Sequence, residues 1–183
     1  MVETTEEKIL KAAVRVFAKK GFDTATTDEI ASKSGVSKGT VFLYFKRKDA
    51  LIERVALASV PFAEVEEALK KRYSSPEELL FDVGMAFLNK YKNEDLRSLL
   101  IMSMAKKDRY RSVGKGLQSL CFSSMDKMFN EIERMVGKPF PEPLRRAYFG
   151  SLLCYVVWWE YNKIDPEDYC RALVSDLLKA VED

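Results

Sequence analysis

The fold of this chain is decided by residues 26–48, which read TTDEIASKSGVSKGTVFLYFKRK. Thr26 or Thr27 can begin a helix by accepting a backbone N–H bond, and two acidic residues follow in the first turn, where the helix dipole favours negative charge. Gly35 can adopt the positive φ that ends this helix in a tight turn. Residues 26–34 are therefore expected to form a short helix with a sharp end.

A second short helix is expected at residues 38–45, with Ser37 as its N-terminal cap. Val41 and Phe45 are four residues apart, so both can face the interior from one side of this helix. The outward positions are then Lys38, Gly39, Thr40 and Tyr44. Two helices joined by a turn that contains glycine are typical of the helix-turn-helix, in which the second helix enters the major groove of DNA.

The exposed residue types decide between DNA binding and a purely structural pair of helices. Helix pairs joined through glycine also occur in all-α proteins that never touch DNA. In this chain, residues able to bind phosphates or bases gather on the second helix and just after it: Lys38, Thr40, Tyr44, Lys46, Arg47 and Lys48. The pattern therefore favours binding to double-stranded DNA.

The composition limits the other functions that the chain can have. Its 183 residues include 30 basic and 28 acidic side chains, so the net charge of +2 provides no general attraction to nucleic acid. Histidine is absent, which removes the commonest general base and the commonest metal ligand. We therefore expect no enzyme activity, no catalytic residues, no cofactor and no metal site.

The three cysteines, Cys121, Cys154 and Cys170, are isolated in apolar settings and form no C-x-x-C pair. This spacing favours buried, unreactive thiols in a reducing compartment, although a redox switch stays open as an alternative. The N-terminus has no charged-then-apolar leader, and no apolar run is long enough to span a bilayer. A cytoplasmic protein with no membrane partner is expected.

Helical spacing of apolar residues begins before the motif. Thr4 and Glu7 fit a capping box that starts a helix, and Gly21 can end it. The apolar residues of this helix and of the motif would form one small core: Ile9, Val14, Phe17, Phe22, Ile30, Ala31, Val36, Val41 and Phe45. A helix-turn-helix domain of three helices is therefore expected at residues 1–48.

The remainder, residues 49–183, also follows helical patterns. Pro61 falls inside an apolar run, so this segment is either a helix that ends near Ser59 or a longer, kinked helix. Ser75 and Glu78 fit a second capping box, with proline at the first helical position. Strand-like alternation is absent, so the chain is expected to be all-α, with about nine helices.

Residues 9–51 read ILKAAVRVFAKKGFDTATTDEIASKSGVSKGTVFLYFKRKDAL. This segment resembles the tetracycline-repressor (TetR) family of transcriptional regulators almost position by position. The rest matches the family only in its number of helices and in having its most apolar helices last. The resemblance implies a repressor that binds a near-palindromic operator as a homodimer. It also implies that a small effector, bound in an effector-binding and dimerisation domain at residues 49–183, releases the repressor from DNA.

The resemblance implies roles for single residues of the motif. The expected DNA-binding residues are Thr27, Lys38, Gly39, Thr40, Phe42, Tyr44, Lys46 and Lys48. Residues 38–40 would face the bases, whereas Thr27, Tyr44 and Lys48 would bind phosphates. Phe42 departs from the pattern, because the family usually has a tyrosine there, and only apolar contact remains. Anchoring would therefore depend more on the basic residues that follow the second helix.

No motif specifies the contents of the implied effector cavity. Bulky, soft or aromatic side chains that could line it are Phe81, Met85, Met102, Phe122, Met125, Phe129 and Tyr148. Each of them taken singly is more often plain core, but together they favour a hydrophobic effector. Recognition of a charged effector by Arg97, Lys106 or Arg145 stays open.

The last two helices are expected at residues 144–161 and 166–181 and would pair with their copies in a four-helix interface. The first of them is apolar on most sides, so it must bury two faces. The expected residues of the dimer interface are Leu152, Tyr155, Val156, Trp159, Leu173 and Leu177.

Two further alternatives stay open. The basic run at residues 106–111 is either a second anion site or a solvated surface, and the solvated surface is favoured. The chain as a whole could be a small helical carrier of lipids or other hydrophobic ligands, or an enzyme, with a non-functional helix-turn-helix. A carrier needs only a cavity, whereas an enzyme needs a nucleophile and base that the sequence does not display.

Overall fold

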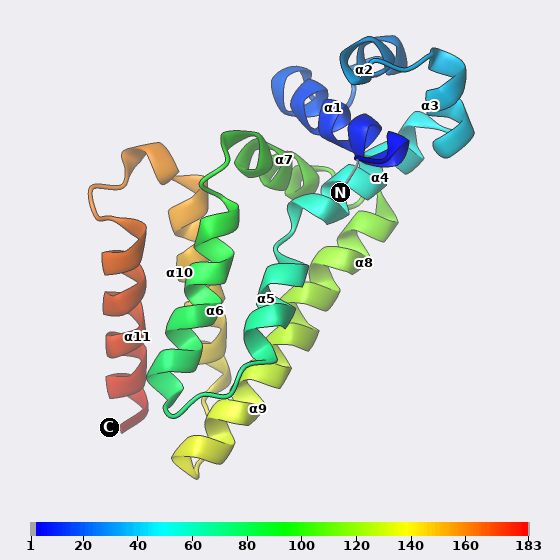
Figure 1. Ribbon diagram of the computed structural model, residues 1–183. Helices are drawn as coiled ribbons and strands as arrows, with labels where there is room; N and C mark the ends of the chain where they lie inside the picture. The colour runs from blue at the N-terminus through cyan, green and yellow to red at the C-terminus, as the bar shows by residue number, and fades with distance from the viewer. Residues whose placement is uncertain (1–2, 183) are drawn as a thin grey trace. The chain divides into compact units, whose positions relative to one another are not determined.

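The computed structural model describes residues 3–182, except for the side chains of residues 120, 121 and 182. This part of the chain is helical throughout and contains no strand, which confirms the all-α class (Figure 1). The helices are α1 (Thr5–Lys20), α2 (Thr27–Ser34), α3 (Lys38–Tyr44), α4 (Lys48–Ser59), α5 (Phe62–Leu69), α6 (Pro76–Lys90), α7 (Glu94–Ala105), α8 (Arg111–Ser119), α9 (Met125–Val136), α10 (Glu142–Val157) and α11 (Pro166–Glu182). A π-helical turn, η1 (Leu120–Ser124), joins α8 to α9 without a break, so the number of separate helices is close to the nine expected.

The chain forms two compact units. The first unit combines Met1–Val60 with Asn93–Leu117, and the second combines Pro61–Lys92 with Gln118–Asp183. Helices α4 and α7 therefore belong with α1–α3, whereas the sequence suggested a boundary after Lys48. The two units are defined by packing within the chain, whereas the boundary after Lys48 was expected to separate DNA binding from effector binding. That functional boundary stays a prediction.

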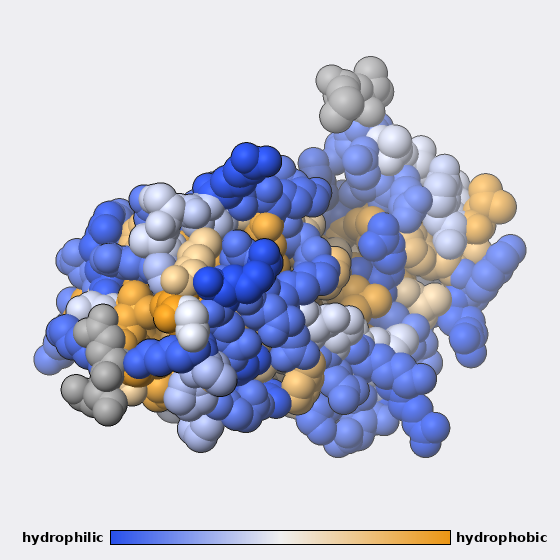
Figure 2. Space-filling view, turned by 90° about the horizontal axis from the view of Figure 1, so that it is seen from below, coloured by the Kyte–Doolittle hydropathy of each residue, from blue (hydrophilic) through white to orange (hydrophobic). Residues whose placement is uncertain are grey.

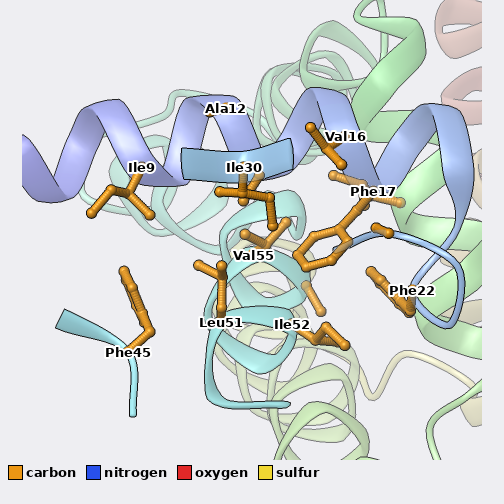
Figure 3. Close-up of a cluster of buried hydrophobic side chains, with 14 of the residues drawn as sticks. Ile9, Ala12, Val16, Phe17, Phe22, Ile30, Phe45, Leu51, Ile52 and Val55 are labelled. Atoms are coloured by element: carbon orange, nitrogen blue, oxygen red, sulfur yellow. The ribbon is translucent and has the colours of Figure 1, made fainter. Parts of the chain in front are cut away.

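The core of the first unit is larger than the three helices of the motif could provide. Ile9, Phe17 and Ile30 are fully buried, as expected, together with Leu51 of α4, and Figure 3 shows these side chains converging. Two expected core residues, Val14 and Val36, are only partly buried. Buried residues that the sequence analysis did not include are Ile52, Val55, Ala56, Leu99, Tyr110 and Val113.

Pro61 ends the apolar run that follows the motif. Helix α4 stops at Ser59, and Val60 is extended, with φ −82° and ψ 137°. This conformation is expected because the proline ring disfavours helical geometry in the residue before it. Of the two alternatives, the helix that ends near Ser59 is therefore correct, and α5 is a separate element.

The N-terminus of α6 differs in one detail from the expected capping box. The Ser75 hydroxyl accepts a hydrogen bond from the backbone N–H of Glu78 at 3.2 Å, as expected. The Glu78 carboxylate, however, accepts from the backbone and hydroxyl of Ser74, at 3.0 and 2.7 Å, rather than from Ser75. Because Ser74 offers two donors, it satisfies the carboxylate better than the single N–H of Ser75.

The core of the second unit is packed tightly around Tyr148, which is fully buried. Its hydroxyl donates a hydrogen bond to the carbonyl of Leu80, and the nearby Cys170 thiol is buried too. A Cβ atom at Gly84 would lie 2.6 Å from the Cys170 sulfur and 2.9 Å from the Tyr148 oxygen. Gly84 is therefore required by the close approach of α6 to these two side chains.

This packing predicts opposite effects for two glycine substitutions in helices of the second unit. Gly84→Ala should lower the free energy of unfolding by about 1–3 kcal/mol, because the two buried neighbours must move. Gly150→Ala is the matched control, because Gly150 is exposed in α10 and a Cβ there meets nothing within 4 Å. It should raise stability by up to about 1 kcal/mol through helix propensity. Urea unfolding measures the free energy of unfolding of both variants. Equal stability of the two would contradict the tight contact at Gly84.

Candidate nucleic-acid interface

Helix α2 is fixed at both ends by its own sequence. Thr26, not Thr27, is the N-terminal cap: its hydroxyl accepts from the N–H of Glu29 at 3.2 Å, and the Glu29 carboxylate accepts from the N–H of Thr26 at 3.0 Å. Lys20 and these Thr26 contacts hold the pKa of Glu29 below its usual range. Gly35 ends the helix with φ 70°. Thr27 thus lies half-buried at the first helical position, beside the positive end of the helix dipole.

Helix α3 is oriented by the residues that it buries. The Ser37 hydroxyl caps it by accepting from the N–H of Thr40 at 3.0 Å. Val41 and Phe45 are buried in the core of the first unit, as the sequence predicted. With these two side chains buried, Lys38, Phe42, Leu43 and Tyr44 are exposed. The helix-turn-helix geometry expected for residues 26–45 is therefore present.

The exposed surface of α3 carries more apolar side chains than expected from the sequence. Phe42 and Tyr44 are exposed, and Leu43 between them is 70% exposed. Leu43 is the most exposed of the three. An exposed apolar side chain on this surface can contact a thymine methyl group or a sugar.

Two of the expected cations are held by neighbouring groups. The Lys38 ammonium lies 2.8 Å from the Asp28 carboxylate, and the Lys48 ammonium donates to the backbone carbonyl of Asp23 at 3.0 Å. Lys46, by contrast, is exposed just after α3. A Cβ at Gly39 would lie 3.6 Å from the Ser37 hydroxyl, which is ordinary contact. The fold itself therefore does not require glycine at position 39.

The side chains suggested for an effector cavity lie in different surroundings. Met102 packs on the core of the first unit, whereas the other six belong to the second unit. In the second unit, Met125, Phe129 and Tyr148 are plain core, and Phe122 is exposed beneath the guanidinium of Arg146. Phe81 is only partly buried beneath Arg171, and Met85 borders an open hollow of about 580 Å3.

The largest hollow described in the second unit is mostly charged. Its volume is about 730 Å3, and its lining residues are Glu66, Leu69, Lys70, Lys71, Arg72, Tyr73, Leu79, Lys127, Asn130, Glu131 and Arg134. None of the expected effector residues borders it. Of the three side chains named for charged recognition, Arg97 and Lys106 lie in the first unit, and Arg145 forms an ion pair with Glu133.

The expected dimer residues need correction as well. Leu152 and Val156 are buried inside the second unit, so they cannot touch another copy, and Tyr155 and Leu177 are nearly as buried. Only Trp159 and Leu173 remain partly exposed. The large apolar side chains that do reach the surface near the end of α10 and just after it are Val157, Trp158, Tyr161 and Ile164. Because α10 is apolar on most sides, its sequence does not show which of its faces packs inside its own unit.

Apolar side chains of the described surface lie in separate patches among hydrophilic ones in the view of Figure 2. None of the helices within residues 3–182 combines the length and the apolar character that crossing a membrane requires.

Two cysteines differ in their surroundings. Cys170 is buried, as expected, and burial raises the pKa of its thiol to about 12, which keeps it protonated. Cys154 is exposed, so the expectation of a buried thiol is wrong there. Its position on the outer side of α10 was not evident from an apolar sequence context. The side chain of Cys121 lies outside the described residues.

Comparisons with known proteins agree with this geometry. Residues 9–55 match the family model for bacterial regulatory proteins of the tetR family. The HTH-type transcriptional regulator YerO of Bacillus subtilis is 53% identical over 47 residues, which are 26% of this chain and 16% of YerO. The regulator AcrR of Shigella flexneri is 25% identical over 79% of this chain and 72% of its own length. The chain thus spans only 16 to 26% of the length of the first relatives that it matches.

Solved structures show that the whole chain shares a fold with such regulators. The FadR regulator of Bacillus subtilis, solved in complex with stearoyl-CoA, superposes with a TM-score of 0.76 and 21% identity over 94% of this chain and 97% of its own. The sequence match supports the motif, and the structural match extends the same architecture to the other helices. Residues 9–55 thus resemble the tetR family of bacterial regulatory proteins, and the chain as a whole shares its fold with the solved FadR structure.

Proposed function

We propose that this chain is a transcriptional repressor of the cytoplasm that binds a near-palindromic DNA operator as a homodimer and is released by a small hydrophobic effector. The observation that carries the proposal is the surface of α3: Val41 and Phe45 are buried, Lys38 and Tyr44 are exposed, and Thr40 is half-buried. A capped helix with this surface fits the major groove. Its relatives are regulators, which argues against an enzyme.

The DNA contact has two parts with different consequences. Lys46 and Lys48 lie after the recognition helix and supply charge for phosphates, so they set affinity on every sequence alike. Thr40 lies within α3, and its hydroxyl is 2.8 Å from that of Ser37. Its methyl and hydroxyl groups can both contact base edges, so it contributes to the choice of sequence.

Dimerisation follows from the exposed apolar side chains near the end of α10. Trp158 is 57% exposed and Tyr161 is 79% exposed, and their rings lie 5.9 Å apart. Val157 and Ile164 extend the same apolar group of residues. Large exposed aromatic groups are typical anchors of protein interfaces.

The effector is proposed to be hydrophobic because the second unit is rich in aromatic and methionine side chains. The related FadR fold holds stearoyl-CoA, a ligand with a long apolar chain. The hollows described above are open and partly charged, so an apolar ligand would have to separate side chains that are now packed. Thermal-shift screening tests this part, because a ligand that binds the folded state raises the melting temperature.

The competing proposal is a carrier of hydrophobic ligands with a non-functional helix-turn-helix. The open, partly charged hollows of the second unit bear equally on a carrier and on a regulator with a hydrophobic effector. The intact caps of α2 and α3 favour a working DNA-binding motif.

A footprint across the DNA upstream of the chain's own gene tests the proposed function. The protein should protect a near-palindromic site, and the affinity should fall steeply with salt because bound phosphates release counterions. With about six phosphate contacts, the affinity should fall about a thousandfold between ~50 and ~200 mM salt. Reproducible absence of any protected site would favour the carrier.

Substitutions should separate affinity from sequence preference. Lys48→Ala should weaken binding on specific and unrelated DNA by the same factor and reduce the salt slope by about one. Thr40→Ala should leave the salt slope unchanged but alter the preferred base at one operator position, by about 1–3 kcal/mol. Fluorescence anisotropy with operator variants measures both. An equal loss on all sequences for Thr40→Ala would exclude its role in base readout.

Sedimentation tests the proposed dimer. Trp158→Glu should raise the dimer dissociation constant at least about tenfold, because the interface would have to bury an unpaired charge. Phe122→Glu is the matched control, since it places the same charge on another exposed aromatic position of the second unit. A monomeric wild-type protein at micromolar concentration, or equal effects of the two variants, would contradict this interface.

A further inference from the structure

Three basic side chains from distant parts of the chain converge on Asp23, in the loop between α1 and α2. The Lys106 ammonium lies 2.8 Å from one carboxylate oxygen, and an Arg109 guanidinium nitrogen lies 2.7 Å from the other. The Lys48 ammonium donates to the Asp23 backbone carbonyl at 3.0 Å. All four residues belong to the first unit. The segment between α7 and α8 therefore lies beside the start of α4.

Positive charge is in excess at this place. Lys106, Arg109 and Lys48 face the carboxylate of Asp23, and the charge of Asp49 also reaches the neighbouring Tyr110. Lys106, with Arg109 and Lys48, holds the pKa of the Asp23 carboxyl below its usual range, so it is ionised at neutral pH. Three basic and two acidic side chains leave this group with a formal charge of +1.

The segment that carries these cations is anchored to the core. Tyr110 is buried, and its ring meets that of Phe22 edge to face, with the centroids 6.1 Å apart. The guanidinium of Arg109 lies over the ring of Tyr110, at 5.4 Å from its centroid. Lys106 and Arg109 keep roughly half of their side-chain surface exposed. They are thus held at a defined place and still open to a ligand.

Phosphate is the ligand that this arrangement fits. Lys48 begins α4, where the helix dipole also attracts anions, and it is the expected phosphate clamp of the motif. Because Lys106 and Arg109 touch the same residue as Lys48, a phosphate beside Lys48 is within reach of both side chains. A guanidinium can bind two phosphate oxygens at once.

We propose that Lys106 and Arg109 form a second phosphate-binding point of the DNA interface, next to Lys48, and that Asp23 competes with the phosphate for them. The inference rests on the proposed function, because it assigns these residues to the same DNA surface. It also assigns part of the basic run at residues 106–111 to an anion site rather than to a solvated surface.

The test uses the full chain and a mixed-sequence DNA duplex of about 30 base pairs, so that no operator need be known. The double variant Lys106→Ala, Arg109→Ala should bind several-fold more weakly at low salt. In a plot of the logarithm of affinity against the logarithm of salt concentration, the slope for the double variant should be smaller in magnitude than that of the wild type by about one to two. Lys107→Ala is the matched control, because Lys107 is equally exposed but forms an ion pair with Asp108 instead of Asp23.

Asp23→Asn keeps the shape of the side chain and removes the competing charge. It should bind the same duplex more tightly than the wild type, and this gain should vanish when Lys106 and Arg109 are alanine. Thermal melting checks that each variant is folded. Weaker binding by Asp23→Asn, or a double variant with the salt slope of Lys107→Ala, would overturn the inference.

The same experiment separates this inference from the proposed function. If the wild type binds with a steep salt dependence and Lys48→Ala reduces it, the DNA-binding function stands whatever the double variant does. If the wild type shows no salt-dependent binding to any duplex, the DNA-binding function and the second phosphate-binding point are both rejected.

Discussion

Burial of Val41 and Phe45 is the constraint on which the DNA-facing surface depends. Helix α3 has only seven residues, so it makes few contacts and has little stability of its own. The two apolar side chains attach it to the core of the first unit and fix its rotation about its own axis. If that rotation changed, Lys38 and Tyr44 would no longer be exposed together. The exposure of the residues proposed to contact DNA is therefore set by two buried side chains.

The local elements of this unit follow from the sequence because each depends on residues that are close together in the chain. The box formed by Thr26 and Glu29, the left-handed Gly35 and the cap by Ser37 lie within twelve residues. Each also agrees with the hydrophobic spacing around it. Such agreement between neighbouring signals is what makes a short segment adopt one structure.

The packing of α7 could not be predicted from the sequence. Its residue Leu99 completes the core of the first unit, although the chain passes through the second unit before reaching it. Nothing in the spacing of residues 95–106 says which of several apolar surfaces this helix will cover. The site at Asp23 was missed for the same reason. The basic run was visible in the sequence, but its neighbours Lys48 and Asp23 could be identified only from the folded chain.

The same reasoning explains why the burial of several expected dimer and effector residues could not be predicted from the sequence. Helix α10 is apolar on most sides, so its sequence does not distinguish Leu152, which is buried in its own unit, from Trp158, which is exposed. Periodicity identifies a buried face only when polar residues mark the opposite one. On α3 the buried face was identified by the four-residue spacing of Val41 and Phe45, although the apolar Phe42 and Leu43 are exposed. A buried face is therefore easier to assign from sequence on α3, where Val41 and Phe45 share one side of a seven-residue helix, than on α10, where apolar residues occupy most sides.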